Sequence, residues 1–92
     1  MIRSYACPET EALSKGERVQ RFVNIAAVAQ RKLRQLQIAG KLNDLRVPPG
    51  NRLEALKGGR LGQHSIRVND QWRVCFRWTE AGAEDVEIVD YH

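Results

Sequence analysis

Apolar residues recur three or four positions apart in the first half of the chain and two positions apart in the second half. The longest run of the first kind forms a single apolar stripe, the pattern of a helix with one buried side. Its members are Phe22, Ile25, Ala26, Ala29, Leu33 and Leu36. Gly40 marks the end of this predicted helix, whose other side is polar and basic. The stripe is therefore predicted to form much of the core.

Two shorter helical segments are predicted on either side of the long helix. The first opens at Pro8, carries acidic residues in its first turn and stops at Gly16, which is the usual order of helix signals. The second is a short turn of helix at 42–45. It ends before Pro48-Pro49-Gly50, because proline has no amide hydrogen to donate and fits badly inside a helix.

The period-two segments of the second half predict strands. They lie at 53–56, 64–68, 71–79 and 85–91. A short first strand at 2–5 is also expected. The turn pairs Asn69-Asp70 and Ala81-Gly82 leave short connections, so an antiparallel meander is predicted. Helices followed by strands indicate one α+β domain over residues 1–92.

The longest predicted strand has two different faces. The residues of its apolar face are Trp72, Val74, Phe76 and Trp78. This face is expected to pack on the long helix, because successive strand residues point to opposite sides of a sheet. Arg73, Cys75 and Arg77 lie on the other face. That second face is predicted to be an open surface that carries cations.

The composition is that of an ordinary globular chain, with 92 residues of which 42% are hydrophobic and 28% are charged. No apolar stretch approaches the roughly 18 residues of a membrane span. The first residues also lack the apolar centre of a secretory signal. We therefore expect a cytoplasmic protein without a membrane partner.

Charge is distributed unevenly along the chain. All 15 basic residues lie within residues 1–78, which hold only six acids, whereas residues 79–92 hold five acids and no Lys or Arg. Eleven of the basic residues are arginine, whose planar guanidinium suits phosphate. Such a chain favours nucleic acid or another polyanion as its partner. A basic surface that only maintains solubility explains the same charge equally well.

The two cysteines, Cys7 and Cys75, stand far apart in the sequence. Neither has the neighbouring cysteine or histidine pair that a zinc site requires. Two reduced, partly buried thiols are expected, because disulfides are rare in the cytosol, and a disulfide is the alternative. No metal and no other cofactor is predicted.

The open face of the longest strand is the first candidate for chemistry. Neighbouring strands are expected to bring Arg67, Lys57 and the chain end, Asp90-Tyr91-His92, to the side that carries Arg73 and Arg77. Cations, a phenol and an imidazole on one surface suit cleavage of RNA. In that reaction the 2′-hydroxyl loses a proton, the phosphorane needs positive charge and the departing 5′-oxygen gains a proton. This chemistry requires no metal.

The same residues also have purely structural interpretations. A strand arginine such as Arg73 is often a surface residue paired with a carboxylate, for which Asp90 is a candidate. Tyr91 can pack on the edge of the sheet. His92 is the last residue of the sequence, and terminal residues often have no role. The pattern of residues alone leaves both interpretations open.

Three segments carry a resemblance to a known family: 48–58 (PPGNRLEALKG), 62–76 (GQHSIRVNDQWRVCF) and 86–92 (VEIVDYH). They resemble the HigB toxins, plasmid-maintenance proteins of the RelE/ParE superfamily. The NDQWR and DYH motifs are specific, and the similarity extends over nearly the whole chain. The resemblance implies an α+β fold in which helices pack against a curved antiparallel sheet.

The resemblance also implies an activity and partners. HigB toxins cut mRNA in the A site of the small ribosomal subunit and so inhibit translation. A cognate HigA antitoxin with a helix-turn-helix fold holds the toxin inactive. The toxin–antitoxin complex represses its own operon, so operator DNA is expected to be bound only through that complex. No cofactor is implied.

Catalytic positions of the family match five residues here: Lys57, Arg73, Asp90, Tyr91 and His92. The resemblance implies that His92 transfers protons, alone or with Asp90. Lys57 and Arg73 would stabilise negative charge, and Tyr91 would orient the substrate or stack on a base. The residues expected to contact the RNA are Arg60, Arg67, Arg77 and His64.

Glu54 departs from the family pattern, because some members have histidine at this position. A carboxylate can act as a base, but it repels phosphate. We interpret Glu54 as a plain strand residue, with a share in proton transfer as the alternative. Two other functions remain open: a gyrase poison of the ParE type, which generally lacks the terminal Tyr-His pair, and a module that binds RNA without cutting it.

Overall fold

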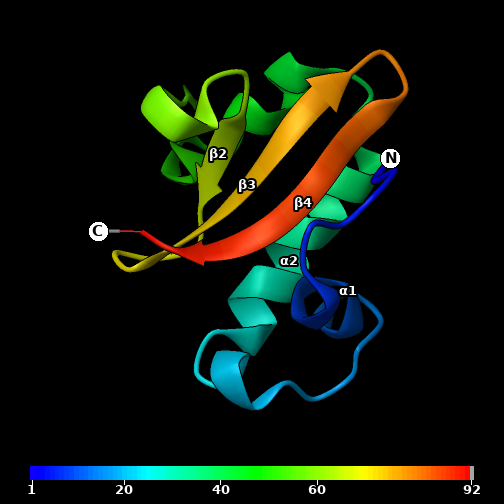
Figure 1. Ribbon diagram of the computed structural model, residues 1–92, viewed down its shortest axis with the longest axis vertical. Coiled ribbons are helices and arrows are strands. Elements are labelled where there is room, and N and C mark those ends of the chain that lie inside the picture. The colour runs from blue at the N-terminus through cyan, green and yellow to red at the C-terminus, as the bar shows by residue number, and fades with distance from the viewer. Residues whose placement is uncertain (92) are drawn as a thin grey trace.

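An antiparallel sheet and a long helix form the two layers of the protein, described here for residues 1–91 of a computed structural model (Figure 1). Within this range the helices are α1 (Pro8–Ser14) and α2 (Ala26–Ile38). The strands are β1 (Glu54–Ala55), β2 (His64–Arg67), β3 (Trp72–Thr79) and β4 (Gly82–Asp90). Single turns of 3-10 helix lie at Gln20–Phe22, Leu42–Arg46, Pro49–Asn51 and Gly58–Arg60. The predicted α+β class is confirmed.

The described sheet is a meander with the strand order β1-β2-β3-β4, in which every neighbouring pair is antiparallel. β4 begins at Gly82, earlier than the predicted residue 85. The turn before it is tight because the Ala81 amide donates a hydrogen bond to Thr79 Oγ1. A Cβ at Gly82 would collide with the Met1 carbonyl oxygen, and φ is +127° there. This turn therefore requires glycine.

The N-terminal segment runs along the outer edge of β4 (Figure 1). It forms two isolated parallel bridges, Ile2 with Ala83 and Tyr5 with Val86. The short strand predicted at 2–5 is therefore not formed, and two isolated bridges lie in its place. The pairing is interrupted at Asp85, where φ is 54° and the amide donates to Ser4 Oγ at 2.9 Å instead of to a backbone carbonyl.

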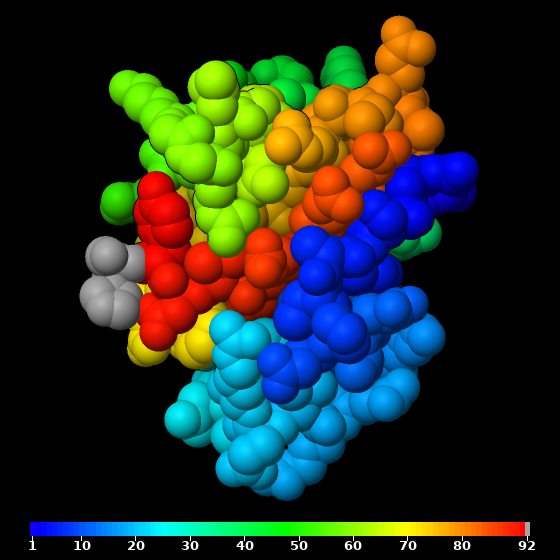
Figure 2. Space-filling view, viewed as in Figure 1, coloured from blue at the N-terminus to red at the C-terminus, as the bar shows by residue number. Residues whose placement is uncertain are grey.

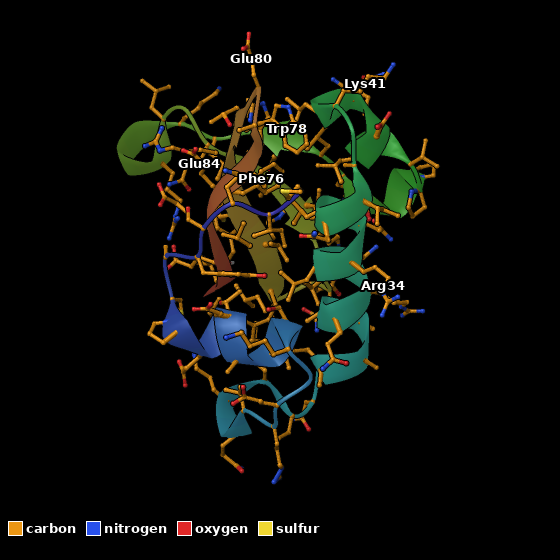
Figure 3. All side chains as sticks on the ribbon, turned by 90° about the vertical axis from the view of Figure 1, so that its right-hand side faces the viewer. Arg34, Lys41, Phe76, Trp78, Glu80 and Glu84 are labelled. Atoms are coloured by element: carbon orange, nitrogen blue, oxygen red, sulfur yellow. The ribbon has the colours of Figure 1, made fainter. Side chains whose placement is uncertain are left out.

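The core lies between α2 and one face of the sheet. The side chains with almost no exposed surface are Phe22, Leu33, Leu36, Ile66, Val74, Phe76, Val86 and Ile88. Trp72 contacts Phe22 edge to face, with ring centroids 5.5 Å apart. Figure 3 shows Phe76 and Trp78 on the side of the sheet that faces α2, and Glu84 on the opposite side. The predicted inward face of β3 is therefore confirmed.

The predicted long helix is divided near its start. Phe22 lies in a separate 3-10 turn, and α2 begins only at Ala26. Phe22, Ala29, Leu33 and Leu36 are still buried, so the stripe forms much of the core as predicted. No helix within residues 1–91 is long and apolar enough to cross a membrane.

Candidate active site

The face of the sheet turned away from α2 carries the candidate site. Residues opposite each other in neighbouring antiparallel strands share a face. Register therefore groups Arg67 with Arg73, and Cys75 with both Ser65 and Glu87. α2 lies behind the sheet in the view of Figure 1, so the reader looks at this outer face. In Figure 2 its left part is formed by the yellow-green segment around residue 60 and by the red chain end.

Arg73 is held at the centre of this face by contacts on several sides. Its Nη1 donates to Ser65 Oγ at 2.7 Å and to the Arg52 carbonyl oxygen at 3.4 Å. The same nitrogen lies 3.4 Å from Glu54 Oε1, and the Arg73 side chain is only 13% exposed. The Tyr91 ring lies against the guanidinium, with Arg73 Cζ 5.7 Å from the centroid of the ring. The guanidinium is thus fixed in position before any ligand binds.

The chain end is fastened to the turn between β2 and β3. The Tyr91 amide donates to the Gln71 carbonyl oxygen at 2.6 Å, and Gln71 Nε2 donates to Asp90 Oδ2 at 3.1 Å. The Tyr91 side chain is partly open to solvent, with 41% of the residue exposed. The structure thus brings Tyr91 close to Arg73, as expected from the strand order. Asp90 lies opposite Trp72 in the sheet register and so shares the inward face of β3, whereas the prediction placed it on the side of Arg73. His92 lies outside the described residues.

Glu54 is a carboxylate that the structure places against Arg73. It lies in β1, directly opposite Ser65 of β2, and its side chain is about half exposed. This position puts Glu54 inside the candidate site, where an exposed carboxylate can accept a proton and also orient the guanidinium.

Most other predicted cations of this face are also paired with carboxylates. Arg60 lies 3.3 Å from Glu87, Arg77 lies 3.8 Å from Asp85, and Arg67 pairs with Asp70. Lys57 is exposed and forms no ion pair within residues 1–91. A polyanion therefore has to compete with acidic side chains for the arginines, whereas Lys57 is available without that competition.

His64 does not lie with the other predicted RNA contacts. It is opposite Phe76 in the sheet register and stacks on that ring, with centroids 6.3 Å apart. Its Nδ1 is buried and has no hydrogen-bond partner in the described part of the chain. His64 therefore lies on the Phe76 side of the sheet and not on the face that carries Arg73, and its contact with RNA stays a prediction. His64 lies two positions before the buried Ile66, and residues two apart in a strand share a face.

The thiols add no nucleophile to the site. Cys7 and Cys75 are both free, as expected. Cys75 is buried under the outer face, and this burial raises the pKa of its thiol, which therefore stays protonated at neutral pH. Within residues 1–91 there is no group of three or more His, Cys, Asp or Glu side chains that could hold a metal ion. Among the described residues, the site offers guanidinium, ammonium, carboxylate and phenol groups.

Three contributors to the site were not predicted from the sequence. Ser65 holds Arg73, Gln71 holds the chain end, and Arg52 supplies a carbonyl oxygen. Ser65 could have been found from strand register, because it lies opposite Cys75 on the predicted outer face. The roles of Gln71 and Arg52 depend on turn geometry and leave no pattern in the residue types.

Comparison with known proteins identifies the class. The chain matches, over residues 14–92, the family model described as "RelE-like toxin of type II toxin-antitoxin system HigB". It belongs to the HigB-like toxin family. This confirms the resemblance inferred from the sequence motifs.

Two relatives and one solved structure are similar to this chain. Toxin HigB-1 of Vibrio cholerae is 51% identical over 53 residues, which cover 58% of this chain and 56% of that protein. An uncharacterized protein of Haemophilus influenzae is 40% identical over 55 residues, covering 60% and 54%. The match thus spans little more than half of each relative. A chain of the YoeB-YefM complex from Staphylococcus aureus has a similar fold, with a TM-score of 0.62, 17% identity and coverage of 100% and 98%.

Proposed function

We propose that this toxin is a metal-independent endoribonuclease that cuts mRNA in the A site of the ribosome and so inhibits translation in the cytoplasm. The observation that carries the proposal is the Arg73 guanidinium, held by Ser65 and Glu54 on an exposed face beside the Tyr91 ring. A fixed cation next to an aromatic ring is suited to a phosphate and its adjoining base.

The reaction assigned to this site is transesterification of RNA. The 2′-oxygen attacks the neighbouring phosphorus after a base removes its proton, and the bond to the 5′-oxygen breaks after that oxygen gains a proton. Arg73 and Lys57 stabilise the negative charge of the phosphorane between these events. Proton transfer is assigned to His92, with Asp90 or Glu54 as the second group. Tyr91 orients the substrate by stacking.

The remaining cations of the outer face are proposed to guide the message. Arg60, Arg67 and Arg77 each exchange a carboxylate partner for a phosphate when RNA binds. This exchange weakens binding to free RNA, because every arginine must give up an ion pair within the protein before it can pair with a phosphate. The ribosome then positions the 2′-oxygen in line with the phosphorus, which the outer face does not do by itself. Such positioning can account for several powers of ten in rate.

The test is cleavage of one message in two forms, alone and bound to a ribosome with an empty A site. We expect cleavage at the A-site codon of the ribosome-bound message and little cleavage of the free message at the same concentration. Equal cutting of both forms would contradict the ribosome requirement. Tight, salt-sensitive binding without cutting would indicate an RNA-binding module, and inhibition of gyrase without cutting would indicate a ParE-type poison.

The proposed partner is a HigA-type antitoxin with a helix-turn-helix fold, and operator DNA is reached only through the complex of the two. The excess of basic residues over residues 1–78 favours an antitoxin with acidic contact segments. Expression of the toxin alone should arrest growth, and co-expression of the neighbouring antitoxin gene should relieve the arrest by mass action. Harmless overexpression of the folded toxin would contradict this partnership.

A further inference from the structure

Asn51 is a fully buried polar residue at the end of the 3-10 turn Pro49–Asn51. Its side chain is bonded to Lys32 Nζ at 2.6 Å, Gln35 Oε1 at 2.8 Å, the Leu45 carbonyl oxygen at 3.1 Å and the Val47 carbonyl oxygen at 3.4 Å. Asn51 Oδ1 accepts from Lys32, and the other three oxygens share the two hydrogens of Nδ2. The amide therefore joins α2 to the segment that leads into β1.

The residues immediately after Asn51 contact the centre of the candidate site. Arg52 has the left-handed conformation, with φ 47° and ψ 53°, which residues other than glycine rarely adopt. Its carbonyl oxygen accepts from Arg73 Nη1, and Glu54, two positions later, lies 3.4 Å from the same nitrogen. The groups that hold Arg73 on this side thus belong to residues within three positions of the buried amide.

Asparagine is the side chain that satisfies all of these partners. An aspartate would direct a carboxylate at the Leu45 and Val47 carbonyl oxygens, which repel it. An alanine would leave the Leu45 and Val47 carbonyl oxygens and the Lys32 ammonium without the hydrogen bonds that the amide makes to them. Neither substitution can hold the segment against α2 as the amide does.

We propose that Asn51 is a positioning residue: its buried amide anchors residues 51–54 to α2 and thereby places the Arg52 carbonyl and Glu54 against Arg73. As a role in catalysis, this inference rests on the proposed function. Loss of the amide lets the segment move, and displacement of a catalytic group by about 1 Å can cost about 100-fold in rate. Asn51→Ala should therefore lower the single-turnover rate at saturating toxin by about 10–100-fold, with little change in the toxin concentration that gives half of the maximal rate.

The decisive experiment is a double-mutant cycle with Arg73. If Asn51 acts through Arg73, Asn51→Ala should cost much less in the Arg73→Ala background than in the wild type. Asn24→Ala, which changes the same residue type at an exposed position, is the control. Equal losses in both backgrounds, or no loss in the wild type, would overturn the proposal. If Asn51→Ala does not fold, the same cycle is run with Lys32→Met, which removes only the bond to Oδ1, and Arg31→Met controls for the lost charge.

An NMR measurement distinguishes failure of this inference from failure of the proposed function. The Nε–Hε signal of Arg73 reports the environment of the guanidinium whether or not the protein cuts RNA. In Asn51→Ala, or in Lys32→Met, we expect this signal to shift or broaden while amide signals of β3 and β4 stay in place. An unchanged Arg73 signal would overturn the positioning role. Absence of cleavage by the wild type would overturn only the proposed function.

Discussion

Replacement of Arg73 by alanine is expected to slow single-turnover cleavage of ribosome-bound mRNA by about 10²–10³-fold. This is the usual loss when one preorganised group is removed from a developing oxyanion. Arg73 suits the role because Ser65 and Glu54 already hold its guanidinium. The Arg73 side chain is only 13% exposed. A charge fixed in this way does not need to reorganise as the phosphorane forms. The measurement is rapid-quench cleavage at saturating toxin.

Two further variants sharpen this prediction. Arg18→Ala removes the same charge from an exposed position outside the site, and it should cut at the wild-type rate. Arg73→Lys keeps the charge but not the planar guanidinium, so it should recover only part of the lost rate. Thermal melts show whether each variant is folded. Wild-type cleavage by folded Arg73→Ala protein would remove Arg73 from the mechanism.

His92→Ala is expected to lower the cleavage rate by about 10²–10⁴-fold, the usual contribution of a general acid or base. If His92 acts only in proton transfer, thermal stability should change little. Ribosome binding should persist, since Lys57 and Arg73 retain their charge. Single-turnover cleavage measures the rate, and a melting curve of the same preparation measures thermal stability.

The outcome of His92→Ala separates three assignments. Slow cleavage with an unchanged melt supports proton transfer by His92. Cleavage near the wild-type rate with an unchanged melt would move proton transfer to Asp90 or to Glu54, which lies beside Arg73. Slow cleavage with a much lower melting temperature would show that His92 has a structural role.

Most of the fold was predictable because local patterns and tertiary structure agree. The stripe that includes Leu33 and Leu36 predicts a buried helix face, and alternation along β3 predicts its two sides. The irregular edge formed by residues 2–5 was not predictable. It depends on the positive φ of Asp85 and on the bond from the Asp85 amide to the Ser4 hydroxyl. These two residues are distant in sequence, so no local pattern indicates their contact.

The candidate site was predictable where it follows from strand register. Arg73 and the chain end meet because β3 and β4 are neighbours, which a short turn implies. Some partners of the arginines were not predictable, since a pair such as Arg60 and Glu87 joins residues distant in sequence, whereas Arg67 and Asp70 are only three positions apart. As a result, the predicted cationic face is in fact largely balanced by carboxylates.

Cleavage of a modified message in the ribosome tests the central claim most directly. The message carries a single 2′-deoxy nucleotide at the linkage that the toxin cuts in the A-site codon, and the products are mapped on a sequencing gel. Attack by the 2′-oxygen predicts that cleavage at this linkage disappears, while the all-ribose message is cut there. Equal cleavage of the deoxy-substituted linkage would contradict the mechanism assigned to the Arg73 site.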